Sequence, residues 1–156
     1  TELYNRETIE SQIDNEITLS EARKSEMAVL FIDVDDFKHY NDQYSHATGD
    51  QVLKFVARTI KGTVNEFGFA GRYGGDEFIA CIRNAEINDP TRAAQDIISK
   101  LEEGFECDGV HLTVSVSIGI SMIKDDYNTR VEYIIGKADD AMYSVKKNGK
   151  SNYAFI

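Results

Sequence analysis

Apolar residues recur along the chain at spacings that distinguish helices from strands. Ile9, Ile13 and Ile17 recur every four residues, which predicts an amphipathic helix. Residues 27–32 form an uninterrupted apolar run of strand length. Such a run is typical of a strand that is buried on both faces. The chain is therefore expected to open with a helix and a core strand.

Two further helices follow from the same kind of pattern. Residues 52–60 carry an apolar stripe that is expected to end near Gly62. A later helix has both of its ends marked. Asp89 suits the N-cap, Pro90 the first helical position and Gly104 the end.

The last third of the chain predicts a strand, a helix and a closing strand. Residues 112–121 alternate between apolar and small or polar residues, which predicts a strand with one buried face. Residues 129–132, Thr-Arg-Val-Glu, resemble a capping box that opens a helix ending at Gly149, and residues 153–156 suit a closing strand. We expect an α/β sandwich with one central, mostly antiparallel sheet covered by helices.

A pair of glycines separates two short alternating segments in the middle of the chain. Residues 67–72 and 78–82 have strand patterns, and the Gly-Gly pair between them favours a two-residue hairpin connection, because both positions tolerate positive φ. Asp76 and Glu77 follow directly. The segment is either an ordinary acidic hairpin or a turn that directs two carboxylates at a metal ion.

Composition narrows the range of partners. The 156 residues carry a formal net charge of −10. This charge argues against a nucleic-acid or anionic-membrane surface, which needs clustered Lys and Arg. Cys81 and Cys107 lack the spacing of metal ligands, and the apolar neighbours of Cys81 predict a buried, reduced thiol. No segment approaches the roughly 20 apolar residues of a membrane span.

The length of 156 residues suits one domain, residues 1–156. The chain starts abruptly and without a signal peptide, so we expect a piece of a longer protein. We expect this domain to be cytoplasmic and to make no membrane contact, whether or not the longer protein has a membrane anchor.

Carboxylates follow the predicted core strand directly. Asp33 comes at the end of the apolar run. It suits the N-cap of a short helix beginning near Phe37. If the strand lies beside the hairpin, Asp33 instead converges with Asp76 and Glu77, and such a cluster is tolerable only when a cation neutralises it. Oxygen ligands of this kind suit Mg²⁺ bound together with substrate phosphates.

Groups suited to phosphates occur in two places. The backbone N–H groups of Asp36 and Phe37 would open a helix N-terminus, with Lys38 on the same turn. Lys146 and Lys150 belong to a basic cluster at the end of the last helix. The helix dipole alone favours lysines there, so this cluster is either structural or a positive patch for a triphosphate.

The segment between these groups suits recognition of a base. Guanine offers N–H donors and two acceptors, so Asp50 and the amide of Asn41 are candidates for selecting it. Asp50 equally suits the cap or first turn of the following helix. His46 has no Cys or His partners at zinc spacing, and we expect an ordered loop residue there rather than a general base.

Together these motifs resemble the GGDEF domain of diguanylate cyclases, in order and over essentially the whole chain. The segments that carry the resemblance are Leu3 to Arg6, residues 33–38 (Asp-Val-Asp-Asp-Phe-Lys), Asn41 with Asp42, His46 with Gly49 and Asp50, residues 72–78 (Arg-Tyr-Gly-Gly-Asp-Glu-Phe), Ser117 with Gly119, and residues 138–150 with Asn152. The resemblance implies a five-stranded central sheet flanked by helices, similar to nucleotide cyclase cores and polymerase palms.

The resemblance also implies a reaction, the condensation of two GTP molecules into cyclic di-GMP with release of two pyrophosphates. The implied cofactor is Mg²⁺ or Mn²⁺, with two ions in each active site. Because each domain of the family holds one GTP, the active species would be a two-fold dimer with a second GGDEF domain. A sensory or regulatory domain would lie elsewhere in the longer protein.

Roles follow by position from the resemblance. Asp33 and the Val34 carbonyl would hold a metal ion, Asp76 would be a metal ligand and general base for the attacking 3′-hydroxyl, and Glu77 would hold the second ion. Lys38 would also take part in catalysis. The implied substrate contacts are Asp36, Phe37, Lys38, Asn41, His46, Asp50, Gly74, Gly75, Lys146 and Lys150.

The chain departs from the family pattern at two places. Ser45 stands where many members have a glycine before His46, which removes no functional group. The inhibitory Arg-x-x-Asp site of many members corresponds to Asn65 and Gly68, which lack the guanidinium and the carboxylate. We therefore predict no product inhibition through that site.

The main alternative is a catalytically silent GGDEF domain that binds GTP or product as a regulatory module. Silent members commonly lose a glycine or an acid of the turn, and this chain keeps both glycines, both acids and Asp33. A cyclase with relaxed base choice is disfavoured by Asp50, since an acid suits the donors of guanine. A non-catalytic interaction domain would leave the coincident metal, base and phosphate motifs without a purpose.

Overall fold

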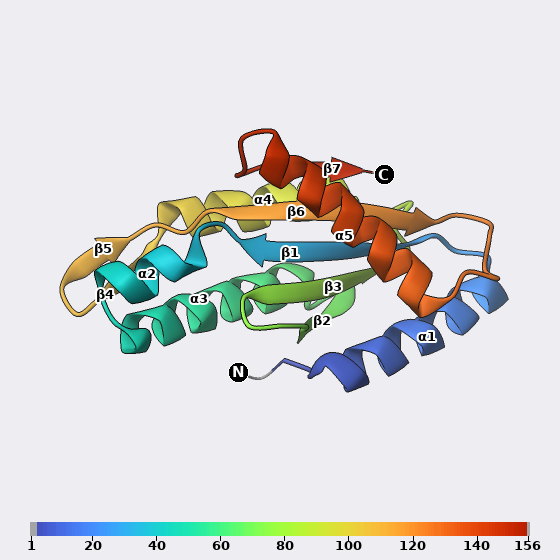
Figure 1. Ribbon diagram of the computed structural model, residues 1–156. Helices are drawn as coiled ribbons and strands as arrows, with labels where there is room; N and C mark the ends of the chain where they lie inside the picture. Colours follow the sequence, from blue (N-terminus) through green and yellow to red (C-terminus); the bar gives the residue numbers. More distant parts are fainter. Residues whose placement is uncertain (1–2, 156) are drawn as a thin grey trace.

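The computed structural model describes residues 3–155 and has a central five-stranded sheet covered by helices (Figure 1). The strand order is β2-β3-β1-β6-β7, and every neighbouring pair is antiparallel except β6 and β7. The strands of this sheet are β1 (Met27–Val34), β2 (Gly68–Arg72), β3 (Glu77–Arg83), β6 (Val116–Ile123) and β7 (Tyr153–Phe155).

The helices form a layer on each face of the sheet. α1 (Arg6–Arg23) and α5 (Val131–Lys147) pack on one face, and α3 (His46–Val64) and α4 (Pro90–Glu103) pack on the other. The short α2 (Phe37–Gln43) packs on α3. A separate small hairpin consists of β4 (Phe105–Cys107) and β5 (Val110–Leu112). The predicted α/β sandwich with a mostly antiparallel sheet is therefore confirmed.

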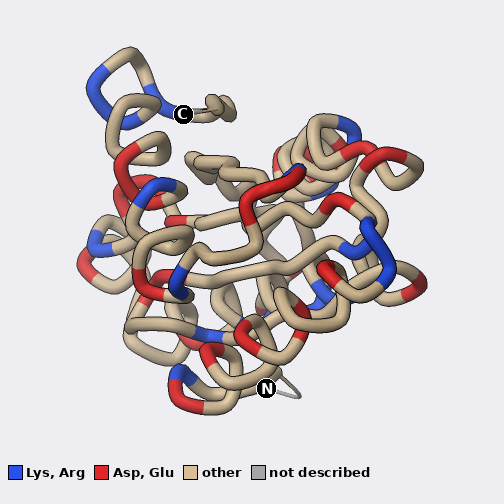
Figure 2. The backbone as a smooth tube through the Cα atoms, turned by 90° about the vertical axis from the view of Figure 1, so that its right-hand side faces the viewer, with Lys and Arg blue, Asp and Glu red and all other residues tan. Residues whose placement is uncertain are grey.

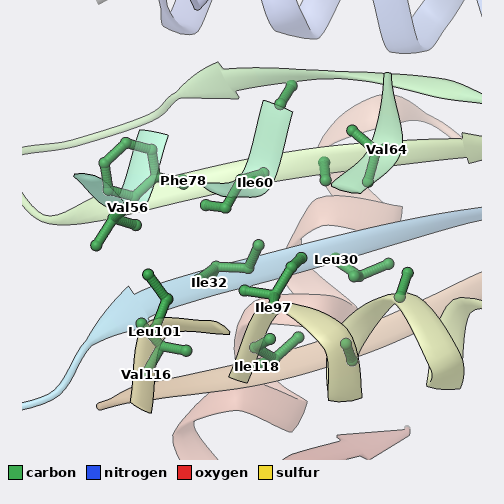
Figure 3. Packing of buried hydrophobic residues seen from close by; sticks show 14 of the residues in the cluster. Leu30, Ile32, Val56, Ile60, Val64, Phe78, Ile97, Leu101, Val116 and Ile118 are labelled. Atoms are coloured by element: carbon green, nitrogen blue, oxygen red, sulfur yellow. The ribbon is translucent and has the colours of Figure 1, made fainter. Parts of the chain in front are cut away.

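The central strand β1 is buried along both faces, as the apolar run predicts. Leu30 and Ile32 face α3 and α4, where they join the core that Figure 3 shows. Val29 and Phe31 face α1 and α5 on the other side. Alternate residues of one strand thus enter two separate cores, and both helix layers depend on β1.

Charged residues lie mainly outside the central sheet. In Figure 2 the Asp, Glu, Lys and Arg positions lie mainly on helices and loops, and the strands in the middle are largely free of them. Among residues 3–155, no helix is both long enough and apolar enough to cross a bilayer. Both cysteines are free thiols, and Cys81 is fully buried as predicted.

The predicted strand over residues 112–121 is wrong in its extent and in its burial. The chain leaves β5 at Leu112 and enters β6 only at Val116. In β6 the small residues are also buried, because α5 covers them. Ser117 is inaccessible to solvent, and a Cβ on Gly119 would lie 1.9 Å from the backbone oxygen of Ala138.

The helix ends agree with the sequence in one case and differ in others. α4 has the predicted caps, since the Asp89 side chain accepts a hydrogen bond from the Thr91 N–H. α3 is longer than predicted and passes through Gly62. The predicted capping box of α5 is absent, because Arg130 occupies the N-cap without a side-chain hydrogen bond. The closing strand is β7, and Ile156 lies outside the described residues.

The contact between Gly119 and α5 gives a test of the packing. Gly119→Ala forces the α5 backbone away from β6, so we expect unfolding to require about 3 kcal/mol less free energy. Gly62→Ala is the matched control, because Gly62 lies in α3 with no atom within 4 Å of an added Cβ. The free energy of unfolding of this control should rise by about 0.5–1 kcal/mol, since alanine is favoured over glycine in a helix. Urea denaturation measures both, and equal stabilities for the two variants would contradict this packing.

Candidate active site

The end of β1 and the turn between β2 and β3 lie at the same end of the sheet (Figure 1). Asp33 belongs to β1 and pairs in register with Glu77 of β3. The Val34 N–H donates to the backbone oxygen of Asp76 at 3.1 Å. The predicted convergence of the three acids is therefore confirmed, and the alternative that Asp33 is a helix N-cap is wrong.

The Asp33 carboxylate has an unusual environment. Its Oδ1 atom is buried and has no hydrogen-bond partner among residues 3–155. Its Oδ2 atom lies 3.5 Å from the Lys146 Nζ. Burial raises the pKa of Asp33 from its ordinary 3.8 to about 7, Lys146 opposes the rise, and the charges of Asp76 and Glu77 add to it. When Asp33 is ionised, Lys146 therefore faces its Oδ2 atom, but no described residue donates a hydrogen bond to its Oδ1 atom.

Glu77 shares this acidic environment. Its pKa is raised first by burial and then by the nearby charges of Asp139 on α5 and of Asp76. Burial and the adjacent Asp140 likewise raise the pKa of Asp139. A cation bound beside Glu77 would stabilise its charged form.

The turn that carries Asp76 differs from the predicted two-residue hairpin. Neither Gly74 nor Gly75 has a positive φ, and the chain turns through residues 73–76. The Arg72 guanidinium holds the turn by donating to the Gly74 oxygen at 3.2 Å and to the Gly75 oxygen at 2.6 Å. A Cβ on Gly74 would lie 2.3 Å from the Glu77 Oε1, whereas one on Gly75 would meet no atom within 4 Å.

Helix α1 also supports the turn, through contacts with Tyr73. The Tyr73 hydroxyl donates to the Glu10 Oε1 at 2.9 Å, and the Arg6 guanidinium lies over the Tyr73 ring at 4.1 Å. The Tyr73 ring also makes an edge contact with Phe31 of β1. The first residue of the turn is thus fixed to two different elements.

A groove of about 380 Å³ opens beside Asp76. It is lined by residues from α2, from the first turns of α3 and from the β2–β3 turn. The lining residues are Phe37, Lys38, Asn41, His46, Asp50, Leu53, Arg72, Gly75 and Asp76. Seven of these nine were proposed from the sequence as substrate or metal contacts, although they come from three separate segments.

The start of α3 orders the part of the groove expected to bind the base. α3 begins at His46, and the Ser45 side chain caps it by accepting from the Thr48 N–H at 3.1 Å. His46 is therefore a helical residue rather than the predicted loop residue. Asp50 lies beyond the first turn, so its alternative role as a cap is wrong. A Cβ on Gly49 would lie 2.0 Å from the Asn41 Oδ1, so only glycine lets the Asn41 amide lie here.

The basic cluster at the C-terminal end of α5, near the C-terminus in Figure 2, contacts the end of β1. Lys146 donates to the Val34 oxygen at 3.3 Å and forms an ion pair with Asp35 at 2.8 Å. Lys150 forms an ion pair with Asp36 at 2.8 Å. Asp36 takes the N-cap position of α2 in a left-handed conformation and makes no side-chain capping bond. The helix dipole is thus not the only reason for lysines at this position.

The donor set fits a divalent metal in part. The orphaned Asp33 oxygen, the Val34 carbonyl and the acids of the turn offer the oxygen ligands that Mg²⁺ prefers. Among the described residues, however, no three His, Cys, Asp or Glu side chains are placed to hold a metal ion alone. A metal ion at this position would need further oxygens, and substrate phosphates are the usual source.

Sequence reasoning missed three features of the site. Arg72 was noticed only as part of the motif, but it lines the groove and holds the turn. Gly49 was not given its packing role against Asn41. Asp35 was not selected, although it is 3% exposed and bound to Lys146. The only sequence signal for Asp35 is its place in the Asp-Val-Asp-Asp run.

The chain matches a known protein family over almost its whole length. The family model described as "Diguanylate cyclase, GGDEF domain" matches residues 1–152. The chain therefore belongs to the GGDEF domain family.

Individual relatives agree with this assignment. Diguanylate cyclase A of Treponema denticola is 38% identical over 136 residues, which cover 86% of this chain and 36% of the relative. Diguanylate cyclase DosC of Escherichia coli is 35% identical over 97% of this chain and 33% of the relative. The chain thus spans about a third of the length of these two relatives. The solved GGDEF domain of YfiN from Pseudomonas aeruginosa superimposes with a TM-score of 0.92 at 32% identity, over 99% of this chain and 97% of that domain.

The raised pKa of Asp33 predicts a pH-dependent stability. Asp33 binds its proton more tightly in the folded state, so its contribution to the free energy of unfolding falls as pH rises from about 4 to 7. Asp33→Asn should therefore be more stable than the wild type at pH 8 by about 1–3 kcal/mol in EDTA, with a smaller difference at pH 5. Asp14→Asn, on the exposed face of α1, is the control. Urea denaturation at both pH values checks this, and a pH-independent difference would contradict it.

Proposed function

We propose that this chain is the catalytic domain of a diguanylate cyclase, which condenses two GTP molecules into cyclic di-GMP and two pyrophosphates. The observation that carries the proposal is the groove. It joins the polar groups of α2 and α3 to Asp76, at the sheet end where Asp33 and Glu77 are paired. The names of the relatives, Diguanylate cyclase A and diguanylate cyclase DosC, support the same reaction.

GTP would lie along this groove. Asp50 accepts hydrogen bonds from the guanine N–H donors, and the Asn41 amide N–H donates to a guanine acceptor. His46 lies beside them. Gly74 and Gly75 permit close approach of the nucleotide. Lys38, the backbone of Asp36 and Phe37, and the lysines Lys146 and Lys150 then contact phosphates. In the structure Lys146 pairs with Asp35, and Lys150 pairs with Asp36. Oxygens of a bound triphosphate would replace these carboxylates as partners of the lysines.

The reaction would start at the 3′-hydroxyl. Asp76 accepts its proton as the oxygen bonds to the α-phosphorus of the other GTP, and the bond from that phosphorus to the pyrophosphate oxygen breaks. Asp33, the Val34 carbonyl, Asp76 and Glu77 would hold the Mg²⁺ or Mn²⁺ ions. Such ions, when bound, neutralise charge on the phosphates and orient the two reacting oxygens. Lys38 stabilises the charge of the departing pyrophosphate.

Two copies of the chain would be required. One groove of this size accepts one nucleotide, and the 3′-hydroxyl must attack a second one. Two grooves facing each other across a two-fold axis would supply both attacks symmetrically. In a protein as long as the two named relatives, other domains would then control activity by bringing the two GGDEF domains together.

The central test is a GTP incubation. The domain fused to a dimerising coiled coil, with Mg²⁺ and GTP, should yield cyclic di-GMP on chromatography. Asp76→Asn should lower the rate at least about 100-fold, because it removes a general base and a metal ligand. It should still bind a GTP analogue, because the groove remains. Asp126→Asn, at an exposed position away from the groove, is the control.

Two results would contradict this proposal. If the fused wild type binds GTP but forms no product, the chain is a silent nucleotide-binding module. If Asp76→Asn forms product at the wild-type rate, the assignment of Asp76 is wrong.

We also propose that the cyclase lacks product inhibition through the Arg-x-x-Asp site. Asn65 is the C-cap of α3 and Gly68 begins β2. The backbone supports the proposal beyond the missing charges. A Cβ on Gly68 would lie 2.0 Å from the backbone oxygen of Cys81, so a carboxylate at this position requires a shift of β2 against β3.

Initial rates with and without added cyclic di-GMP test this point. At saturating GTP, which keeps product out of the groove, we expect the rates to be the same within about twofold. Asn65→Arg should not create inhibition, because position 68 still lacks its carboxylate. Strong inhibition of the wild type by low micromolar product would contradict the proposal.

A further inference from the structure

Asp35 is a buried carboxylate to which the proposed reaction assigns no role. It is 3% exposed, although it lies only two residues from Asp33. It accepts hydrogen bonds from the hydroxyls of Ser115 and Ser117, the latter at 2.6 Å, and from the Ser151 N–H at 3.1 Å. Lys146 completes the set at 2.8 Å. A buried charge with this many donors is fixed in one position.

The Lys146 ammonium lies between Asp35 and the proposed metal ligands. Its Nζ is 2.8 Å from the Asp35 Oδ1, 3.3 Å from the Val34 oxygen and 3.5 Å from the Asp33 Oδ2. The shortest contact is thus to the carboxylate that is not a proposed metal ligand. Asp33 keeps one oxygen without any partner among the described residues. The ammonium therefore leaves part of the acidic site open.

A lysine and a divalent ion would compete for the same oxygens. An ammonium is a mobile point charge with three donors, and it moves toward whichever anions are nearest. If Asp35 were neutral, the nearest anion to Lys146 would be Asp33. Lys146 would then occupy the position of the metal ion instead of the edge of the site.

We propose that Asp35 is a positioning residue that holds Lys146 at the edge of the acidic site. There the ammonium faces the phosphates, and Asp33 and the Val34 carbonyl remain available to a divalent ion. The inference rests on the proposed function, because it concerns how nucleotide and metal share one site.

The turn after α5 supports the same role. Gly149, Lys150 and Ser151 have positive φ values of 108°, 64° and 47° in succession. Residues that carry a side chain, such as Lys150 and Ser151, rarely adopt this backbone conformation, so surrounding contacts must hold it. The bond from the Ser151 N–H to Asp35 is one such contact, and it also fixes the backbone next to Lys150. One buried carboxylate thus positions Lys146 directly and the backbone of Lys150 through Ser151.

A double-mutant cycle tests this inference without turnover. The proteins are the wild type, Asp35→Asn, Lys146→Met and the double variant. Calorimetry measures the affinity for the α,β-methylene analogue of GTP, which cannot be cyclised, in Mg²⁺ and in EDTA. The ratio of the two affinities isolates the metal contribution from the direct contacts between lysine and phosphate.

Asp35→Asn should lower this ratio about tenfold when Lys146 is present. In the Lys146→Met background, it should change the ratio less than about twofold, because no ammonium remains to move onto Asp33. Ser117→Ala, a neutral change beside Asp35, should leave the ratio within about twofold of the wild type. If Asp35→Asn does not fold by circular dichroism, Asp35→Thr takes its place as a second neutral replacement, and the ratio should fall again only with Lys146 present.

The failures of the two proposals are distinguishable. If Asp35→Asn lowers the affinity ratio equally with Lys146 and with Lys146→Met, Asp35 has a merely structural role or binds the metal ion directly. This result overturns the present inference alone. A wild-type ratio of one means that Mg²⁺ does not assist nucleotide binding, and overturns the proposed metal site together with the inference.

Discussion

The antiparallel pairing of β1 with β3 is the constraint on which the acidic site depends. Its register places Asp33 opposite Glu77, and the bond from the Val34 N–H to the Asp76 oxygen extends the pairing into the turn. A slip of one residue would turn the acids to the opposite face. Such a slip is prevented because β1 is buried on both faces and its alternate residues enter two different cores. The geometry of the site thus follows from the packing of the fold.

The same burial makes the site electrostatically unfavourable without a ligand. Taking Asp33 out of water raises its pKa to about 7, and the charges of Asp76 and Glu77 add to that rise. Asp35, only two residues away, has the opposite outcome. Burial alone would raise its pKa as well, but the bonds from Lys146, two serines and a backbone N–H outweigh burial and lower it. The fold satisfies the Asp35 carboxylate, whereas one oxygen of Asp33 has no hydrogen-bond partner among residues 3–155, and a cation would supply one.

Much of this arrangement could be predicted from the sequence, because local patterns carry it. The apolar run predicted β1, and Asp89, Pro90 and Gly104 marked the ends of α4. Seven of the nine residues that line the groove were found because each belongs to a short motif with its own chemistry. Their convergence could be stated only as a condition, since the order of the strands in the sheet is not a local property.

Two of the failures have a common physical cause, which is packing against elements distant in sequence. Alternation over residues 112–121 indicates a half-buried strand, but α5 approaches so closely that the small residues are buried too. Ser117 and Ser121 remain satisfied because their hydroxyls donate to Asp35 and to the Ile134 oxygen. Asp35 was missed for the same reason, since all of its partners lie at least 80 positions along the chain.

The two glycines of the turn show how a correct motif can have a different physical basis from the expected one. Positive φ was the expected reason for Gly74 and Gly75, and neither residue has it. Gly74 instead makes room for the Glu77 carboxylate, which a Cβ would approach to 2.3 Å. Packing does not require glycine at position 75, because an added Cβ would meet no atom within 4 Å and would lie at the groove. The absence of a side chain at Gly75 leaves this part of the groove open, which fits the close approach of the nucleotide that we propose.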